Sequence, residues 1–258
     1  MSNLGFNFGP DVRPLAARMR PETLNDYIGQ QHLLSPDKPL YQAILAGRCH
    51  SLILWGPPGV GKTTLAQIIA NHADASLIQM SAVTAGVKDI REAVSEAKTN
   101  LAGRGQRTLL FVDEVHRFNK SQQDAFLPHI EDGTFIFVGA TTENPSFEIN
   151  AALLSRMQVY VLNSHSAEDL KRMIDLANTT DYAIKNELNI TAHDFLLRQS
   201  GGDARKLYNL IELCFGQSKP GQEIDEPFAQ QILSNAQIRY DKGGDEHYNI
   251  ISAFIKSI

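Results

Sequence analysis

Cysteine is scarce in this chain of 258 residues, which contains only Cys49 and Cys214. The two lie far apart and show no C-x-x-C spacing, which argues against a zinc site, and the eight histidines show no metal-ligand spacing either. So few cysteines fit a reducing compartment, and we expect a cytoplasmic protein.

Long apolar runs and an excess of basic charge are also missing. No run approaches membrane-spanning length, and the N-terminus lacks the charged and apolar regions of a signal peptide. The formal net charge is −5. This balance excludes a global positive field of the kind that drives unspecific nucleic-acid binding, so any contact with DNA must be local.

Short, continuous apolar runs are present instead, and they predict the fold. Continuous rather than alternating apolarity indicates strands buried on both faces, as in a parallel sheet. Segments with helical spacing lie between them, for example residues 89–101. The alternation predicts a doubly wound α/β domain at residues 1–163. The five predicted strands are residues 52–55, 77–80, 109–112, 135–138 and 159–162.

The chain changes character after Leu162, where only helical patterns follow. We therefore predict a small helical domain at residues 164–240. Near the end of the chain, an apolar stripe with helical spacing stops without a capping residue, which favours a chain that continues over a helix packed back on the body. The stripe is Ile250, Ile251, Phe254, Ile255 and Ile258. Predicted helix caps are Ser166, Thr191, Asp203 and Asp225, for helices reaching about residues 178, 198, 215 and 236.

A phosphate-binding loop follows the first predicted strand and precedes a helical segment that starts at Thr64. Its spacing is G-x-x-x-x-G-K-T, in which glycines let backbone N–H groups point at phosphate oxygens. Lys62 would reach the β- and γ-phosphates of ATP, and Thr63 would bind Mg²⁺. Together with Thr64, the predicted nucleotide contacts are Gly56, Pro57, Pro58, Gly59, Val60, Gly61, Lys62 and Thr63.

Two carboxylates, Asp113 and Glu114, end the third predicted strand. Opposite a phosphate loop, the first would hold Mg²⁺ and the second would act as the general base that polarises the attacking water. The sequence thus predicts a site for ATP hydrolysis.

Two arginines leave alternatives open. Arg205 falls in the first turn of a predicted helix, where the dipole disfavours cations, so it either meets an anion such as the ATP γ-phosphate or is solvated or paired with Asp203. Arg156 follows the short helical run 150–154, whose C-terminus suits a cation. Its alternative role is an arginine finger offered to a neighbouring subunit's γ-phosphate.

Together these residues resemble the AAA+ ATPases, specifically their clamp-loader group. The resemblance implies an AAA+ phosphate-loop domain followed by a helical lid. It also implies roles for single residues: Tyr27 and Ile28 on the adenine side, Thr142 as sensor 1, Arg156 as arginine finger and Arg205 as sensor 2. The matching segments are residues 20–24, 27–30, 139–142, 155–156 and 202–205.

Three longer segments, residues 81–91, 114–124 and 139–150, resemble the replication-associated recombination protein A family. The resemblance implies a DNA-associated ATPase that acts at stalled replication forks and during recombination, forms tetramers and associates with single-stranded-DNA-binding protein. It also implies that residues 241–258 begin a further helical domain that mediates oligomerisation.

Local contact with DNA has two candidate clusters. His116, Arg117 and Lys120 lie beside Phe118, which could stack on a base, although a polar loop with Asn119 or Ser121 capping the next helix explains the same residues. The second cluster, around a glycine turn, is Lys98, Arg104 and Arg107.

Other functions stay open from the sequence. A nucleotide-gated scaffold with little turnover would need neither the base nor the finger. Within the enzymes, a clamp-loader subunit or a Holliday-junction motor shares the core motifs.

Overall fold

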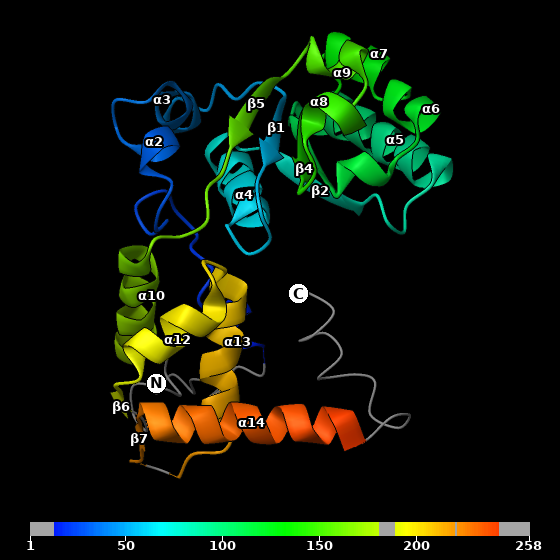
Figure 1. The fold of residues 1–258 in the computed structure, drawn as a ribbon. Helices are drawn as coiled ribbons and strands as arrows, with labels where there is room; N and C mark the ends of the chain where they lie inside the picture. Colours follow the sequence, from blue (N-terminus) through cyan, green and yellow to red (C-terminus); the bar gives the residue numbers. More distant parts are fainter. Residues whose placement is uncertain (1–12, 181–188, 220, 243–258) are drawn as a thin grey trace, which may run out of the picture. The chain divides into compact units, whose positions relative to one another are not determined.

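The computed structural model describes residues 13–180, 189–219 and 221–242, in two compact units (Figure 1). One unit is Pro21–Ser164, and the other joins the described residues up to Arg20 to those from His165 onward. The predicted apolar stripe from Ile250 lies outside the described residues.

The first unit contains a five-stranded parallel sheet in the order β2-β3-β4-β1-β5, and all five predicted strands are confirmed. The strands are β1 (Leu52–Trp55), β2 (Ser76–Ser81), β3 (Thr108–Asp113), β4 (Ile136–Thr141) and β5 (Gln158–Val161).

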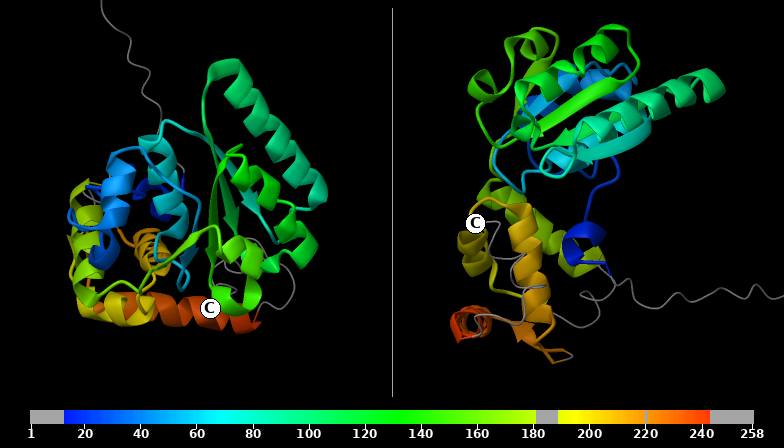
Figure 2. Two further views of the ribbon diagram at one scale, coloured as in Figure 1. Left: turned by 90° about the horizontal axis from the view of Figure 1, so that it is seen from above. Right: turned by 90° about the vertical axis from the view of Figure 1, so that its right-hand side faces the viewer.

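Helices cover both faces of this sheet (Figures 1 and 2), which explains why its strands are apolar throughout. Leu52 and Leu54 point to the face covered by α3 (Pro39–Leu45) and α4 (Lys62–His72), whereas Ile53 points to the face covered by α5 (Val87–Arg104). The remaining helices of the unit are α2 (Gln31–Leu34), η1 (Val115–Arg117), α6 (Lys120–Asp124), α7 (Leu127–Glu131), α8 (Pro145–Glu148) and α9 (Ala151–Leu154).

The second unit is mainly helical, and three of its four predicted caps are confirmed. Ser166 Oγ accepts the N–H of Asp169, Asp203 accepts that of Lys206, and Asp225 accepts that of Phe228. Its helices among the described residues are α1 (Leu15–Arg18), α10 (Ala167–Thr180), α12 (His193–Ser200), α13 (Ala204–Phe215) and α14 (Glu226–Lys242).

Thr191 was a wrong prediction as a helix cap, because its hydroxyl donates to Glu223 Oε1 at 2.7 Å and α12 begins after Ala192 without a side-chain cap. Thr191 follows β6 (Asn189–Ile190), which pairs with β7 (Glu223–Ile224). This two-residue ladder adds a small β element to a unit predicted as all-helical.

The division of the chain into two units also differs from the predicted domains, at the N-terminal end of the predicted α/β domain. Leu15 of α1 is fully buried, and its backbone N–H donates to Glu212 Oε1 of α13 at 2.9 Å. Arg18 pairs with the same carboxylate at 3.5 Å. These contacts assign the described residues before Pro21 to the helical unit rather than to the α/β domain.

Candidate active site

The carboxyl ends of β1, β3 and β4 meet at one edge of the parallel sheet, where open α/β sheets bind ligands. The phosphate-loop sequence follows β1 and the two carboxylates follow β3. Because β4 lies between these strands, Thr142 just after it stands between the loop and the carboxylates. Topology thus gathers three predicted site elements.

The phosphate loop requires its glycines. Gly59 and Gly61 have φ of 69° and 93°, a region that other residues rarely adopt. A Cβ on Gly56 would collide with the Leu162 carbonyl. Gly61 caps α4 with no side-chain hydrogen bond, so the first N–H groups of the helix stay available for phosphate oxygens.

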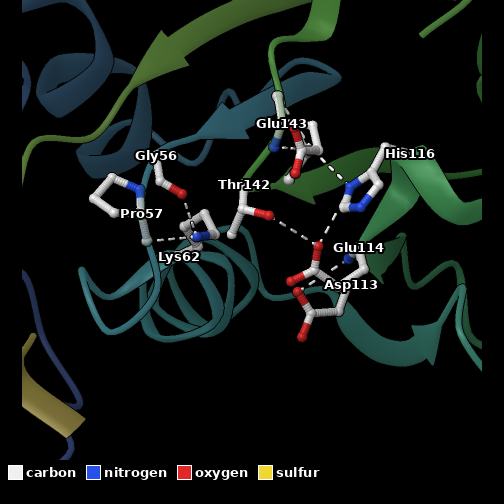
Figure 3. A network of polar contacts seen from close by, with 9 residues as sticks. Gly56, Pro57, Lys62, Asp113, Glu114, His116, Thr142 and Glu143 are labelled. Atoms are coloured by element: carbon white, nitrogen blue, oxygen red, sulfur yellow. Dashed lines mark hydrogen bonds and ion pairs between the residues drawn. The ribbon is translucent and has the colours of Figure 1, made fainter. Parts of the chain in front are cut away.

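Lys62 is buried, and its Nζ donates to the carbonyl oxygens of Gly56 at 2.7 Å and Pro57 at 2.8 Å (Figure 3). A buried ammonium needs such acceptors, and phosphate oxygens would supply stronger, charged ones. Thr63 and Thr64 follow in the first turn of α4 and are half-buried. The loop therefore fits a polyphosphate.

Tyr27 lies against this loop. Its hydroxyl donates to the Val60 carbonyl at 3.1 Å, and a Cβ on Gly61 would collide with it. Burial raises the pKa of the Tyr27 hydroxyl, so it stays a neutral donor. Ile28 beside it is half-buried. Tyr27 thus contacts the phosphate loop itself, while the adenine-side role of Tyr27 and Ile28 stays a prediction.

Asp113 and Glu114 turn sharply at the end of β3. Asp113 Oδ1 accepts the Glu114 N–H at 3.1 Å, and Glu114 has φ of 52°, a left-handed conformation uncommon outside glycine. Such strain costs about 1–3 kcal/mol and clusters at functional sites. Thr142 Oγ1 lies 3.5 Å from Glu114 Oε2, which brings the predicted base and the predicted sensor together (Figure 3).

The donors near the loop fit Mg²⁺ rather than a metal held by protein alone. Within the described ranges, no group of three or more His, Cys, Asp or Glu side chains could hold a metal ion. Mg²⁺ in nucleotide sites needs only one or two protein oxygens beside phosphates and water. Asp113 and Thr63 would supply them.

Arg156 is held at the surface by an acidic partner. Its Nε donates to Glu131 Oε1 at 2.6 Å, and one terminal nitrogen donates to the Ala152 carbonyl at 2.8 Å. Its side chain is 39% exposed and that of Glu131 53%. The predicted finger is therefore accessible and paired within its own chain.

Arg205, in the first turn of α13, is exposed, and no residue among those described forms an ion pair with it. It belongs to the helical unit, so its role toward a nucleotide stays a prediction.

The structure changes most of the interpretation of the first candidate DNA cluster. Phe118 is 3% exposed and packs on Phe126, with ring centroids 5.8 Å apart, so base stacking by Phe118 was a wrong prediction. Asn119 caps α6 in a capping box with Gln122, as the alternative interpretation expects. Of the cluster, Arg117 and Lys120 are exposed, while the His116 side chain is only 8% exposed.

The second cluster is compatible with DNA but untested. Lys98, Arg104 and Arg107 are all exposed, the last two beside a shallow hollow that also includes Asp74. Their contact with DNA stays a prediction.

Comparison with known proteins agrees with this geometry. Residues 52–164 match the model of the ATPase family associated with various cellular activities (AAA), and residues 182–258 match the AAA C-terminal domain. RuvB of Thermotoga maritima, described as a Holliday junction branch migration motor, has the same fold: TM-score 0.66, 24% identity, covering 92% of this chain and 85% of that one. Fold, site and family models define an AAA+ ATPase.

Sequence relatives narrow the class. Replication-associated recombination protein A of Escherichia coli K12 is 51% identical over all of this chain and 60% of its own length. The Haemophilus influenzae protein of that name is 50% identical over all of this chain and 59% of its own. ATPase WRNIP1 of Dictyostelium discoideum is 39% identical over 95% of this chain and 30% of its own. The chain belongs to the replication-associated recombination protein A family and spans about three fifths of the length of the bacterial relatives it matches.

Among the described residues, no helix has the length and apolarity to cross a membrane.

Proposed function

We propose that this protein binds ATP with Mg²⁺, hydrolyses it, and couples hydrolysis to work on DNA at stalled replication forks and recombination intermediates. The observation that carries the proposal is the gathering of the phosphate loop, Asp113, Glu114 and Thr142 at one edge of the sheet. A protein that only binds nucleotide needs the loop but not a carboxylate placed as a base.

Each group has a distinct task in the proposed reaction. Lys62 exchanges its loop carbonyls for β- and γ-phosphate oxygens. Glu114 accepts a proton from the attacking water, whose oxygen bonds to the γ-phosphorus while the bond to the leaving ADP oxygen breaks. Mg²⁺, held through Thr63 and Asp113, would neutralise charge on the phosphates. Thr142 would sense the γ-phosphate beside the base, and Arg205 would be the second sensor of that phosphate.

Arg156 requires a second copy of the chain in this proposal. It lies after α9 and just before β5, and it already has an anionic partner in Glu131. In an oligomer it would exchange that carboxylate for the γ-phosphate bound to the neighbouring subunit, since guanidinium binds phosphate bidentately. We propose a homotetramer as the active assembly.

The DNA part of the proposal is supported by the names of the relatives, which associate them with replication and recombination. It includes single-stranded-DNA-binding protein as a partner and the cytoplasm as the place of action. Because the net charge is −5, contact with DNA would be confined to local groups such as Arg104 and Arg107.

Steady-state ATP hydrolysis with and without forked DNA tests the coupling. We expect DNA to raise the turnover rate, and we expect this stimulation to fall as salt is raised, because phosphate contacts release counterions. No DNA binding and no stimulation at low salt would contradict the DNA part. Tight ATP binding with turnover no faster than that of Glu114→Gln would instead favour a nucleotide-gated scaffold.

A further inference from the structure

His116 lies beside the predicted base rather than on a DNA-binding surface. Its Nδ1 is 3.3 Å from Glu114 Oε2 (Figure 3). The same nitrogen lies 2.9 Å from Thr141 Oγ1. The side chain is 8% exposed, so water competes little for these contacts. This placement gives His116 a use that the phosphate-loop and carboxylate motifs do not account for.

The neighbours of His116 determine which ring nitrogen carries hydrogen. The carboxylate of Glu114 can only accept, so an unprotonated Nδ1 would face it as a second acceptor. Thr141 is fully buried, and its hydroxyl already donates to the Glu143 carbonyl at 3.3 Å and accepts the Glu143 N–H at 3.0 Å. Both partners are therefore satisfied when Nδ1 carries the hydrogen and donates to them.

Two donors then converge on a single oxygen of the base. Thr142 Oγ1 lies 3.5 Å from Glu114 Oε2, the oxygen that His116 also contacts, and no described residue donates to Oε1. Holding Oε2 from two sides fixes the carboxylate and leaves Oε1 to accept from the attacking water. Fixed geometry of this kind is what a general base needs.

We propose that His116 is a positioning residue, which donates from Nδ1 to Glu114 and Thr141 and thereby holds the base in its reactive orientation. The inference rests on the proposed ATP hydrolysis and adds a residue to it. Thr141, at the end of β4, anchors the imidazole from the other side, so the strand that Thr142 follows also helps to position the base.

Paired substitutions test this role. His116→Ala removes the donor, whereas His116→Asn keeps an N–H near the position of Nδ1. We expect the alanine variant to lower kcat by about 10- to 100-fold with unchanged ATP affinity, and the asparagine variant to recover most of that loss. His50→Ala is the matched control, because His50 is also half-buried and hydrogen-bonded, to Tyr160 at 3.1 Å, just before β1.

Two further measurements separate positioning from a merely structural role. Adding His116→Ala to Glu114→Gln should not slow hydrolysis further, because the histidine acts through the carboxylate. Nitrogen-15 NMR of the imidazole should show the hydrogen on Nδ1, and a hydrogen on Nε2 alone would overturn the proposal. So would an asparagine variant as slow as the alanine variant when both melt like the wild type.

The hydrolysis rates of the wild type, Glu114→Gln and His116→Ala distinguish the proposed ATP hydrolysis from the proposed positioning role of His116. If the wild type is no faster than Glu114→Gln, ATP hydrolysis at this site fails, and the role of His116 fails with it. If the wild type is much faster than Glu114→Gln while His116→Ala equals the wild type, only the positioning role is overturned.

Discussion

Glu114 and Arg156 are both predicted to act on the γ-phosphate, yet the structure holds them differently. Glu114 is contacted by His116 and Thr142 of its own unit, in a strained backbone conformation at the sheet edge. Arg156 is tied to an exposed carboxylate, Glu131, whose charge already balances its own. The predicted base is thus held in place within one chain, whereas the predicted arginine finger would have to leave Glu131 before it could act.

In the proposed reaction, this difference makes hydrolysis depend on assembly. An exposed ion pair is worth only about 0.2–1 kcal/mol, so a phosphate from a neighbour could displace Glu131 at little cost. In a monomer, Arg156 would remain paired with Glu131. Substitutions in the two regions should therefore respond differently to protein concentration.

The largest effect on ATP binding is expected at the phosphate loop. Lys62→Ala removes the ammonium and should weaken ATP binding by about 100-fold, since hydrogen bonds to charged groups are worth about 1.5–3 kcal/mol each. Calorimetric titration with ATP measures this loss of affinity, and we expect the loss to be independent of whether subunits associate. Lys88→Ala is the control, because that lysine side chain is 88% exposed. ATP affinity unchanged by Lys62→Ala would contradict the phosphate-loop assignment.

Arg156→Ala should act only where subunits associate. We expect unchanged ATP binding and hydrolysis slower by at least about tenfold at concentrations that give oligomers, because an arginine finger stabilises transition-state charge. Sedimentation on the same samples establishes the assembly state. Arg198→Ala removes a comparable pair with Glu226 at 2.6 Å and should have no effect. An equal loss in a demonstrably monomeric sample would contradict action in trans.

Glu131→Gln should have the smallest effect and the opposite sign. Releasing the arginine removes a competitor worth up to about 1 kcal/mol, so hydrolysis by the oligomer should rise by up to about fivefold. Glu92→Gln, which removes the exposed pair with Lys88, is the control. A fall in hydrolysis with Glu131→Gln would mean that the carboxylate orients the arginine instead of withholding it.

Much of this site could be predicted from the sequence, because the succession of strands, loops and helices along the chain determines where its residues lie. A buried strand, a glycine loop and a helix must place Lys62 at the carboxyl edge of a parallel sheet, and a second buried strand places Asp113 and Glu114 there too. The apolar runs predicted the strands well because both faces of the sheet are covered.

The rest depends on contacts that no local pattern reveals. The pairs Leu15 with Glu212 and Arg156 with Glu131 join residues far apart in the sequence. His116 lies against the Glu114 carboxylate just after a residue in the left-handed conformation, and apolar spacing encodes neither feature. One signal for the burial of Phe118 was available in the sequence. Val115 and Phe118 are three residues apart, which is the period of a 3₁₀ turn, and both face the core.

Single-turnover hydrolysis of saturating ATP by the wild type and by Glu114→Gln tests directly whether Glu114 at the sheet edge is the base. We predict equal ATP affinity for the two proteins and a hydrolysis rate for the glutamine variant lower by about 100- to 10,000-fold. Hydrolysis by Glu114→Gln at the wild-type rate would contradict this prediction.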